Sequence, residues 1–108
     1  MRIIQGQQKN RRFTMPKNLK IRPTTDLAKE SLFNILENMY TLNNLEILDL
    51  FSGSGNITYE FCSRGSSVTS VEINKKCINF IKKTSKDLEV QNIIIHKDCL
   101  RFLKTCSS

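Results

Sequence analysis

The apolar residues of this chain follow two spacings that alternate from residue 25 onwards. In some segments they repeat at helical spacing, whereas other segments are short, nearly continuous apolar runs of the kind found in buried strands. Strands that alternate with helices predict an α/β fold with an open parallel sheet and right-handed crossovers. The segments expected to be helices are 25–39, 56–64, 74–87 and a last one after residue 98, and the expected strands are 45–50, 67–73 and 91–96.

The same spacing predicts which side chains of each helix face the sheet. In the first helix we expect an inward apolar face formed by Ala28, Leu32, Ile35, Leu36 and Met39. In the next two helices the expected inward residues are Ile57, Phe61, Cys77, Ile78 and Ile81. The lysines at 75, 76, 82, 83 and 86 fall on the outer side of the third helix. We favour a solvated face for them, with a secondary RNA contact as the alternative.

The first 22 residues differ in charge from the rest of the chain. Residues 2–6 and 11–15 predict a small hairpin that Pro16 ends. Residues 1–22 contain seven Lys and Arg and no acid, whereas the other ten basic residues are matched by all ten acids, so the net charge of +7 resides in this arm. A basic arm on a neutral domain is typical of a polyanion-binding surface, although a solvated arm has the same composition. We expect a basic arm at 1–22 and a domain at 23–108.

The segment Arg22-Pro23-Thr24-Thr25-Asp26 joins the arm to the first helix. Pro23 disfavours helical geometry at Arg22, a threonine can cap the helix, and Asp26 suits its positive first turn. Two interpretations stay open. The segment is only a well-formed helix start, or Arg22 also contacts an RNA phosphate or base.

The segment Asp49-Leu-Phe-Ser-Gly-Ser-Gly55 follows the first expected strand. Gly53 and Gly55 permit positive φ and leave room for a ligand, and the next helix begins just after them. The loop is therefore a candidate floor for a nucleotide-like ligand, although an ordinary strand-to-helix turn is the alternative. A dinucleotide site would need a third glycine where Thr58 stands, and the Asp49 carboxylate would repel a pyrophosphate.

Two further acids fall near the ends of the second and third expected strands. Glu72 is placed where a carboxylate can accept the ribose hydroxyls of a nucleoside bound over the first loop, and together with the loop we favour this role. Asp98 lies where an adenine amino group would then be. It is also a suitable N-cap for the last helix, and both roles are compatible.

The cysteines and the single histidine predict no metal site. Cys62, Cys77, Cys99 and Cys106 form no Cys-x-x-Cys pair, and His96 is the only histidine. Buried free thiols in a reducing compartment are the simplest interpretation. Neither a signal peptide nor an apolar stretch of membrane-spanning length is expected, so we predict a cytoplasmic chain without a membrane partner.

The motifs named above, taken together and in this order, resemble one family. Arg2-Ile-Ile-x-Gly6, Arg22-Pro-Thr-Thr-Asp26, Asp49-Leu-Phe-Ser-Gly-Ser-Gly55 and Val71-Glu72 are similar to the RsmD-type bacterial 16S ribosomal RNA guanine-N2 methyltransferases. These are class I S-adenosylmethionine-dependent enzymes with a Rossmann-like, doubly wound parallel sheet. The resemblance spans nearly the whole chain, and the chain corresponds to the first half of that fold.

The resemblance implies methyl transfer from S-adenosylmethionine to the exocyclic amine of a guanine in small-subunit ribosomal RNA, either naked or in an assembling ribonucleoprotein. It implies cofactor binding by Asp49, Phe51, Ser52, Gly53, Ser54, Gly55, Glu72 and Asp98. The basic arm supplies the expected RNA-binding residues, which are Arg2, Lys9, Arg11, Arg12 and Arg22.

One segment of the family pattern is absent. Such enzymes carry a catalytic Asn/Asp-Pro-Pro-Phe/Tyr segment after a fourth strand, whereas the only prolines here are Pro16 and Pro23. We therefore expect no catalytic residue in this chain, little activity of the chain alone, and an unpaired apolar side on its first strand. The alternatives are a non-catalytic RNA-binding remnant and a fragment of a DNA amino-methyltransferase. A nicotinamide-dependent enzyme is disfavoured by Thr58 and Asp49.

Overall fold

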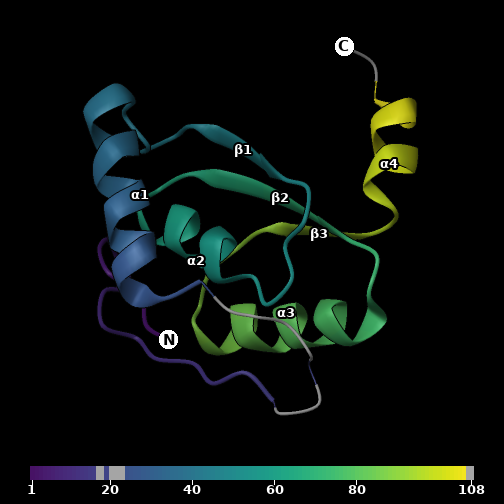
Figure 1. Ribbon diagram of the computed structural model, residues 1–108, viewed down its shortest axis with the longest axis horizontal. Helices are drawn as coiled ribbons and strands as arrows, with labels where there is room; N and C mark the ends of the chain where they lie inside the picture. The colour runs from purple at the N-terminus through teal and green to yellow at the C-terminus, as the bar shows by residue number, and fades with distance from the viewer. Residues whose placement is uncertain (17–18, 20–23, 107–108) are drawn as a thin grey trace.

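The computed structural model describes residues 1–16, 19 and 24–106 (Figure 1). It contains a three-stranded parallel sheet in the order β1-β2-β3, in which Asp49 pairs with Ser70 and Glu72 pairs with His96. The predicted α/β alternation is confirmed. The elements are α1 (Asp26–Met39), β1 (Glu46–Asp49), α2 (Asn56–Ser63), β2 (Ser67–Glu72), α3 (Lys75–Asp87), β3 (Ile93–His96) and α4 (Cys99–Thr105).

The strands run side by side across the centre of Figure 1, with α2 and α3 below them, α1 at one end and α4 at the other. Because all three strands are parallel, their carboxyl ends meet at one edge of the sheet. The loops that follow β1 and β2 therefore start from this common edge.

Two apolar clusters hold the helices and the arm to the sheet. Phe33 of α1, Leu42, Phe61 of α2 and Val68 of β2 form one of them. Residues of the arm, α2 and α3 form the other, which contains Ile3, Phe13, Tyr59, Ile81 and Leu88. The start of the arm thus packs into the core, while the predicted boundary at residue 22 lies outside the described residues.

The predicted N-terminal hairpin is present in a reduced form. Arg2 and Arg12 form an isolated antiparallel bridge, and the Ile3 N–H donates to the Arg11 carbonyl at 2.9 Å. The residues on either side of the bridge form no regular strand, so pairing in the arm is limited to this short contact.

Helix α1 starts as predicted but turns a different face inward. The Thr25 hydroxyl accepts the Ala28 N–H at 3.1 Å and caps the helix. The expected inward face is wrong for four of its residues, which are exposed: Ala28, Leu32, Ile35 and Met39. The buried residues of α1 are Lys29 and Phe33, because the neighbouring α2 presents a buried carboxylate that requires a cation and an aromatic ring that packs on Phe33.

Strand β1 is an edge strand in the described part of the chain. Its neighbour on one side is β2, and no described strand pairs with its other side. Leu48 is 44% exposed, so the expectation of a buried strand is wrong for this residue. The unpaired side of β1 stays a prediction.

Candidate cofactor-binding site

The loop after β1 has the backbone geometry that its glycines predict. Gly53 has φ +53° and Gly55 has φ +82°, both in the left-handed region. A Cβ built on Gly55 would lie 2.5 Å from the Tyr59 ring, which is fully buried and whose hydroxyl donates to the Ser54 carbonyl at 2.7 Å. Glycine is therefore required at position 55 by both the backbone angle and the close approach of Tyr59.

Glu72 connects the end of β2 to this loop. Its Oε1 accepts the Gly53 N–H at 2.8 Å, and its Oε2 accepts the Asn74 N–H at 2.9 Å. The Ser52 N–H also donates to the Val71 carbonyl at 3.3 Å. Each carboxylate oxygen has a second acceptor site, so Glu72 can hold the loop and still accept ligand hydroxyls.

Asp49 is positioned by a residue that replaces the third glycine of dinucleotide-binding loops. The buried Thr58 hydroxyl donates to Asp49 Oδ2 at 2.7 Å and lies 2.9 Å from the Ser70 hydroxyl. Asp49 Oδ1 has no hydrogen-bond donor among the described residues. The structure therefore brings Asp49, the loop and Glu72 together at the carboxyl edge of the sheet, as the sequence predicts.

The other predicted loop residues differ in exposure. Ser52 and Ser54 are buried, and the Ser52 hydroxyl donates to the Asp49 carbonyl at 3.1 Å. Phe51 is 79% exposed. The loop thus has a polar, buried base and one exposed aromatic side chain, which can cover a planar ligand group.

Asp98 caps α4. Its Oδ2 accepts the Arg101 N–H at 3.2 Å, which confirms the N-cap interpretation. The pairing of Glu72 with His96 puts Asp98 two residues past the end of β3. Its role toward an adenine stays a prediction.

The predicted RNA-binding residues of the arm divide into two groups. Arg2 lies 3.8 Å from Asp26, while Arg11 donates to Gln8 and to the Asp87 carbonyl and lies 3.6 Å from Glu89. Lys9 and Arg12 are exposed and form no ion pair with described residues. The hypothesis for Arg22 concerns a position outside the described residues.

The structure contains a buried cluster of charged side chains that the sequence analysis did not predict. Lys29 Nζ lies 3.3 Å from Glu60 Oε1, and both side chains are fully buried. Glu60 Oε2 accepts the Arg64 Nε–H at 2.8 Å, and its two oxygens also accept the Ile4 and Gln5 backbone N–H groups at 2.9 and 3.1 Å. Burial is the main cause that lowers the pKa of Lys29 below 10.5, and it outweighs the opposite effect of Glu60.

This cluster fastens the arm to the helices. Lys29 also donates to the Arg2 carbonyl at 2.6 Å and to Asn56 Oδ1 at 2.8 Å. The sequence held only a partial signal, namely the spacing of Glu60 and Arg64 by one helical turn. The cluster thus joins α1, α2 and the start of the arm through hydrogen bonds and ion pairs.

Other chemistry is not indicated in the described ranges. Residues 1–16, 19 and 24–106 contain no group of three or more His, Cys, Asp or Glu side chains that could hold a metal ion, and their cysteines are free. The expectation that these thiols are buried is confirmed for Cys77 and wrong for Cys106, which is exposed at the end of α4. Among these same residues there is no helix with the length and apolar character needed to cross a membrane.

Comparison with known proteins decides the family. The family described as Conserved hypothetical protein 95 matches residues 1–108. The chain belongs to this family. A relative named ribosomal RNA small subunit methyltransferase D, from Buchnera aphidicola subsp. Baizongia pistaciae, is 39% identical over 94 residues, which cover 86% of this chain and 47% of the relative. The chain thus spans about half the length of the curated relatives it matches.

Solved structures support the same assignment. The structure of a protein named putative methyltransferase yhhF, from Escherichia coli, matches with a TM-score of 0.81 and 28% identity, over 95% of this chain and 55% of that one. The structure of a protein named SAM dependent methyltransferase, from Agrobacterium tumefaciens, matches with a TM-score of 0.64 and 25% identity, over 86% of this chain and 30% of that one. The family member described here therefore has the Rossmann-like methyltransferase architecture in its sheet and helices.

Proposed function

We propose that this chain binds S-adenosylmethionine over the loop of Phe51–Gly55 and forms the methyl-donor portion of a ribosomal RNA guanine-N2 methyltransferase. The observation that carries the proposal is the position of Glu72, which fastens the glycine loop while keeping acceptor capacity at the edge of the sheet. The names of the curated relatives and of one structural neighbour support the reaction class.

The residues present fit such a cofactor. Glu72 is suited to accept the ribose hydroxyls, and Asp98 to accept the adenine amino group while it caps α4. Asp49 places a carboxylate beside the loop, which favours the cationic end of this ligand and disfavours a pyrophosphate. Gly53 and Gly55 let the backbone approach the ligand closely. When bound, the cofactor supplies an electrophilic methyl group.

The acceptor in this proposal is the exocyclic amine of a guanine in small-subunit ribosomal RNA. An enzyme that acts on one base of a structured RNA must take that base out of its stack. The Asn/Asp-Pro-Pro-Phe/Tyr segment that holds the amine in the resembling enzymes does not occur in this sequence. The chain alone is therefore expected to bind the donor and to transfer its methyl group slowly or not at all. We also propose that the boundary between the basic arm and the methyl-donor domain lies near residue 22.

Calorimetric titration of the chain with S-adenosylmethionine tests the proposal. We expect saturable binding at one site that weakens at least about tenfold in Asp49→Ala and in Glu72→Ala, because each loses a contact worth about 1.4 kcal/mol or more. Glu46→Ala is a matched control, since Glu46 is an exposed acid at the opposite end of β1.

Absence of binding to the folded chain, or equal binding by all four proteins, would overturn the proposal. An RNA affinity that is the same in the parent, Asp49→Ala and Glu72→Ala, together with no affinity for the cofactor, would instead favour a non-catalytic RNA-binding module. Preference for DNA over RNA of the same sequence would favour the DNA amino-methyltransferase alternative.

A further inference from the structure

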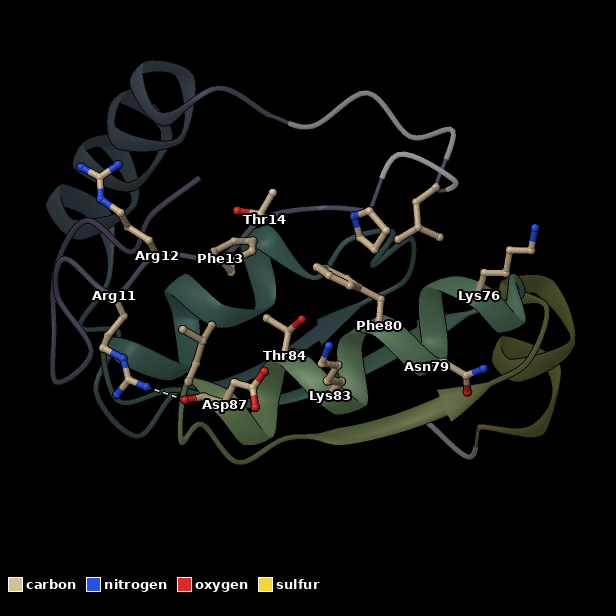
Figure 2. Close-up of a pocket in the computed structure, with 13 residues that line it drawn as sticks. Arg11, Arg12, Phe13, Thr14, Lys76, Asn79, Phe80, Lys83, Thr84 and Asp87 are labelled. Carbon is tan, nitrogen blue, oxygen red and sulfur yellow. Dashed lines mark hydrogen bonds between the residues drawn. The ribbon is translucent and has the colours of Figure 1, made fainter.

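We propose that the pocket between the arm and α3 holds an unpaired nucleotide of the RNA, with the base against Phe80 and the phosphates on the basic rim. The inference deepens the proposed function and rests on it, but it concerns a surface separate from the glycine loop. The pocket has a volume of about 480 Å³ and is shown in Figure 2. This size is within the range of small-molecule pockets and suits one nucleotide.

The floor of the pocket is apolar and well fixed. Phe13 packs edge-on against Tyr59 with ring centroids 5.0 Å apart, and Leu88 is buried in the same cluster. Pro16 and Leu19 line the pocket from the arm side. A planar, weakly polar group such as a nucleobase can bury its faces here without displacing a side chain from the core.

The rim of the pocket is basic. Arg12, Lys76 and Lys83 line it, all three are exposed, and no described acidic side chain lies within ion-pair distance of them. Arg11 also lines the pocket but is already engaged by the Asp87 carbonyl and by Glu89. Asp87 is the one acid among the described lining residues, so the rim has an excess of cations that suits phosphates.

Side chains that suit a base lie between the floor and the rim. Phe80 is half-buried and points from α3 toward the arm, as does Thr84 (Figure 2). Asn79 and Thr14 add an amide and a hydroxyl to the lining, which can pair with the edge of a base. An aromatic face flanked by cations is the combination that single-stranded nucleic acid binds. This arrangement disfavours the interpretation of the lysines at 76 and 83 as merely solvated.

The position of the pocket connects it to the candidate cofactor site. Asn74 caps α3 by accepting the Lys76 N–H at 2.9 Å, and its own N–H donates to Glu72. Lys76 is therefore in the first turn of α3, close to the carboxyl edge of the sheet, and Lys83 lies about 10 Å farther along the helix. RNA bound along α3 would thus lead toward the proposed methyl donor.

The test is fluorescence anisotropy of the full chain with a labelled 12-nucleotide single-stranded RNA and a duplex RNA of the same sequence. The first variant is Arg12→Glu with Lys83→Glu. Its matched control is Arg101→Glu with Lys82→Glu, which changes the charge equally at exposed residues outside the pocket. The second variant is Phe80→Leu, which removes the aromatic face and keeps an apolar side chain. Circular dichroism verifies that each variant is folded.

We expect the pocket charge variant to lose far more single-strand affinity than its control, with the salt dependence of log K lowered by about 1.4 because two phosphate contacts are removed. Phe80→Leu is expected to weaken single-strand binding at least about fivefold and duplex binding little, because only an unpaired base can stack. All variants should bind S-adenosylmethionine like the parent chain.

Equal loss in the pocket variant and its control would overturn the inference, as would single-strand binding that is unchanged in Phe80→Leu. Failure of the parent to bind single-stranded RNA while it binds S-adenosylmethionine would overturn this inference alone. A parent chain that does not bind S-adenosylmethionine would overturn the proposed function instead. The two failures are therefore distinguishable.

Discussion

The Glu72 carboxylate accepts the backbone N–H of Gly53 at 2.8 Å, across nineteen residues of sequence. This bond fastens the glycine loop of β1 to the end of β2. The second oxygen of Glu72 accepts the Asn74 N–H and so fixes the start of α3 as well. One residue therefore shapes the loop and, in the proposed function, also supplies the acceptor for the ribose.

Gly55→Ala is predicted to destabilise the chain. The left-handed backbone angle at this position costs about 1–2 kcal/mol for a residue with a Cβ, and the added atom would also meet the buried Tyr59 ring. Urea unfolding followed by circular dichroism measures the change in the free energy of unfolding. Ser67→Ala, at an exposed strand position, is the control. A Gly55→Ala chain as stable as the parent would contradict the described loop.

Substitutions in the buried charge cluster are predicted to follow a definite order. Glu60→Ala is expected to cost about 3–5 kcal/mol, because it leaves Lys29 and the two backbone donors of the arm without their acceptor. Lys29→Met should cost less, because Glu60 keeps Arg64 and the backbone donors. Glu37→Ala is the control, since this exposed partner of Arg64 contributes about 1 kcal/mol or less. Denaturant unfolding measures all three, and the reverse order would refute the role of Glu60.

The contribution of Lys29 to stability is predicted to depend on pH. Burial lowers its pKa in the folded chain, so between that pKa and 10.5 the unfolded chain holds a proton that the folded chain has released. The contribution of Lys29 to the free energy of unfolding therefore increases as pH rises from its folded pKa to 10.5. This contribution is lost again as pH falls to the folded pKa. The difference in unfolding free energy between the parent and Lys29→Met should grow toward pH 10.5, whereas a shrinking difference would indicate a raised pKa.

The four free thiols are predicted to react at different rates. Burial raises the pKa of Cys62 to about 11, so about one molecule in a thousand carries its thiolate at pH 8, and burial also raises the pKa of Cys77. Cys106 is exposed, and Cys99 is half-buried. Titration of the native chain with a thiol-reactive disulfide should therefore show a fast phase that Cys106→Ser removes. Four equal rates in the native chain would be incompatible with this burial.

The open edge of β1 is predicted to promote self-association. Leu48 is exposed on a strand whose second side has no described partner, and such edges pair with other chains. Leu48→Lys should lower the concentration-dependent mass measured by size-exclusion chromatography with light scattering. Leu103→Lys makes the same change at a similarly exposed position on α4 and should have a smaller effect. Equal effects of the two would indicate general charge repulsion rather than edge pairing.

Much of the fold was predictable because local signals agree with the tertiary structure. The apolar run before Asp49, the paired glycines and the threonine cap each fix a boundary through their own geometry, so β1, α2 and α1 begin within one or two residues of the prediction. The carboxyl ends of parallel strands then necessarily bring the loop and Glu72 together.

The inward face of α1 was not predictable in the same way. Leu32, Ile35 and Met39 have the spacing of a core face, whereas Lys29 has the appearance of a solvated residue. Its burial depends on Glu60, which is distant in sequence, and on backbone groups of the arm. Long-range pairing of charges leaves no periodic signal, so the sequence indicated neither this cluster nor the pocket that the arm forms with α3.

The most direct test of the cofactor site is an NMR titration of the 15N-labelled chain with S-adenosylmethionine, with a nicotinamide dinucleotide as the comparison ligand. We predict saturable chemical-shift changes at the backbone amides of Gly53, Gly55 and Asn74 with S-adenosylmethionine and not with the dinucleotide. These amides belong to the loop or donate to Glu72. Shifts confined to other parts of the folded chain, or a response of the loop to both ligands alike, would contradict the assignment of this loop to S-adenosylmethionine.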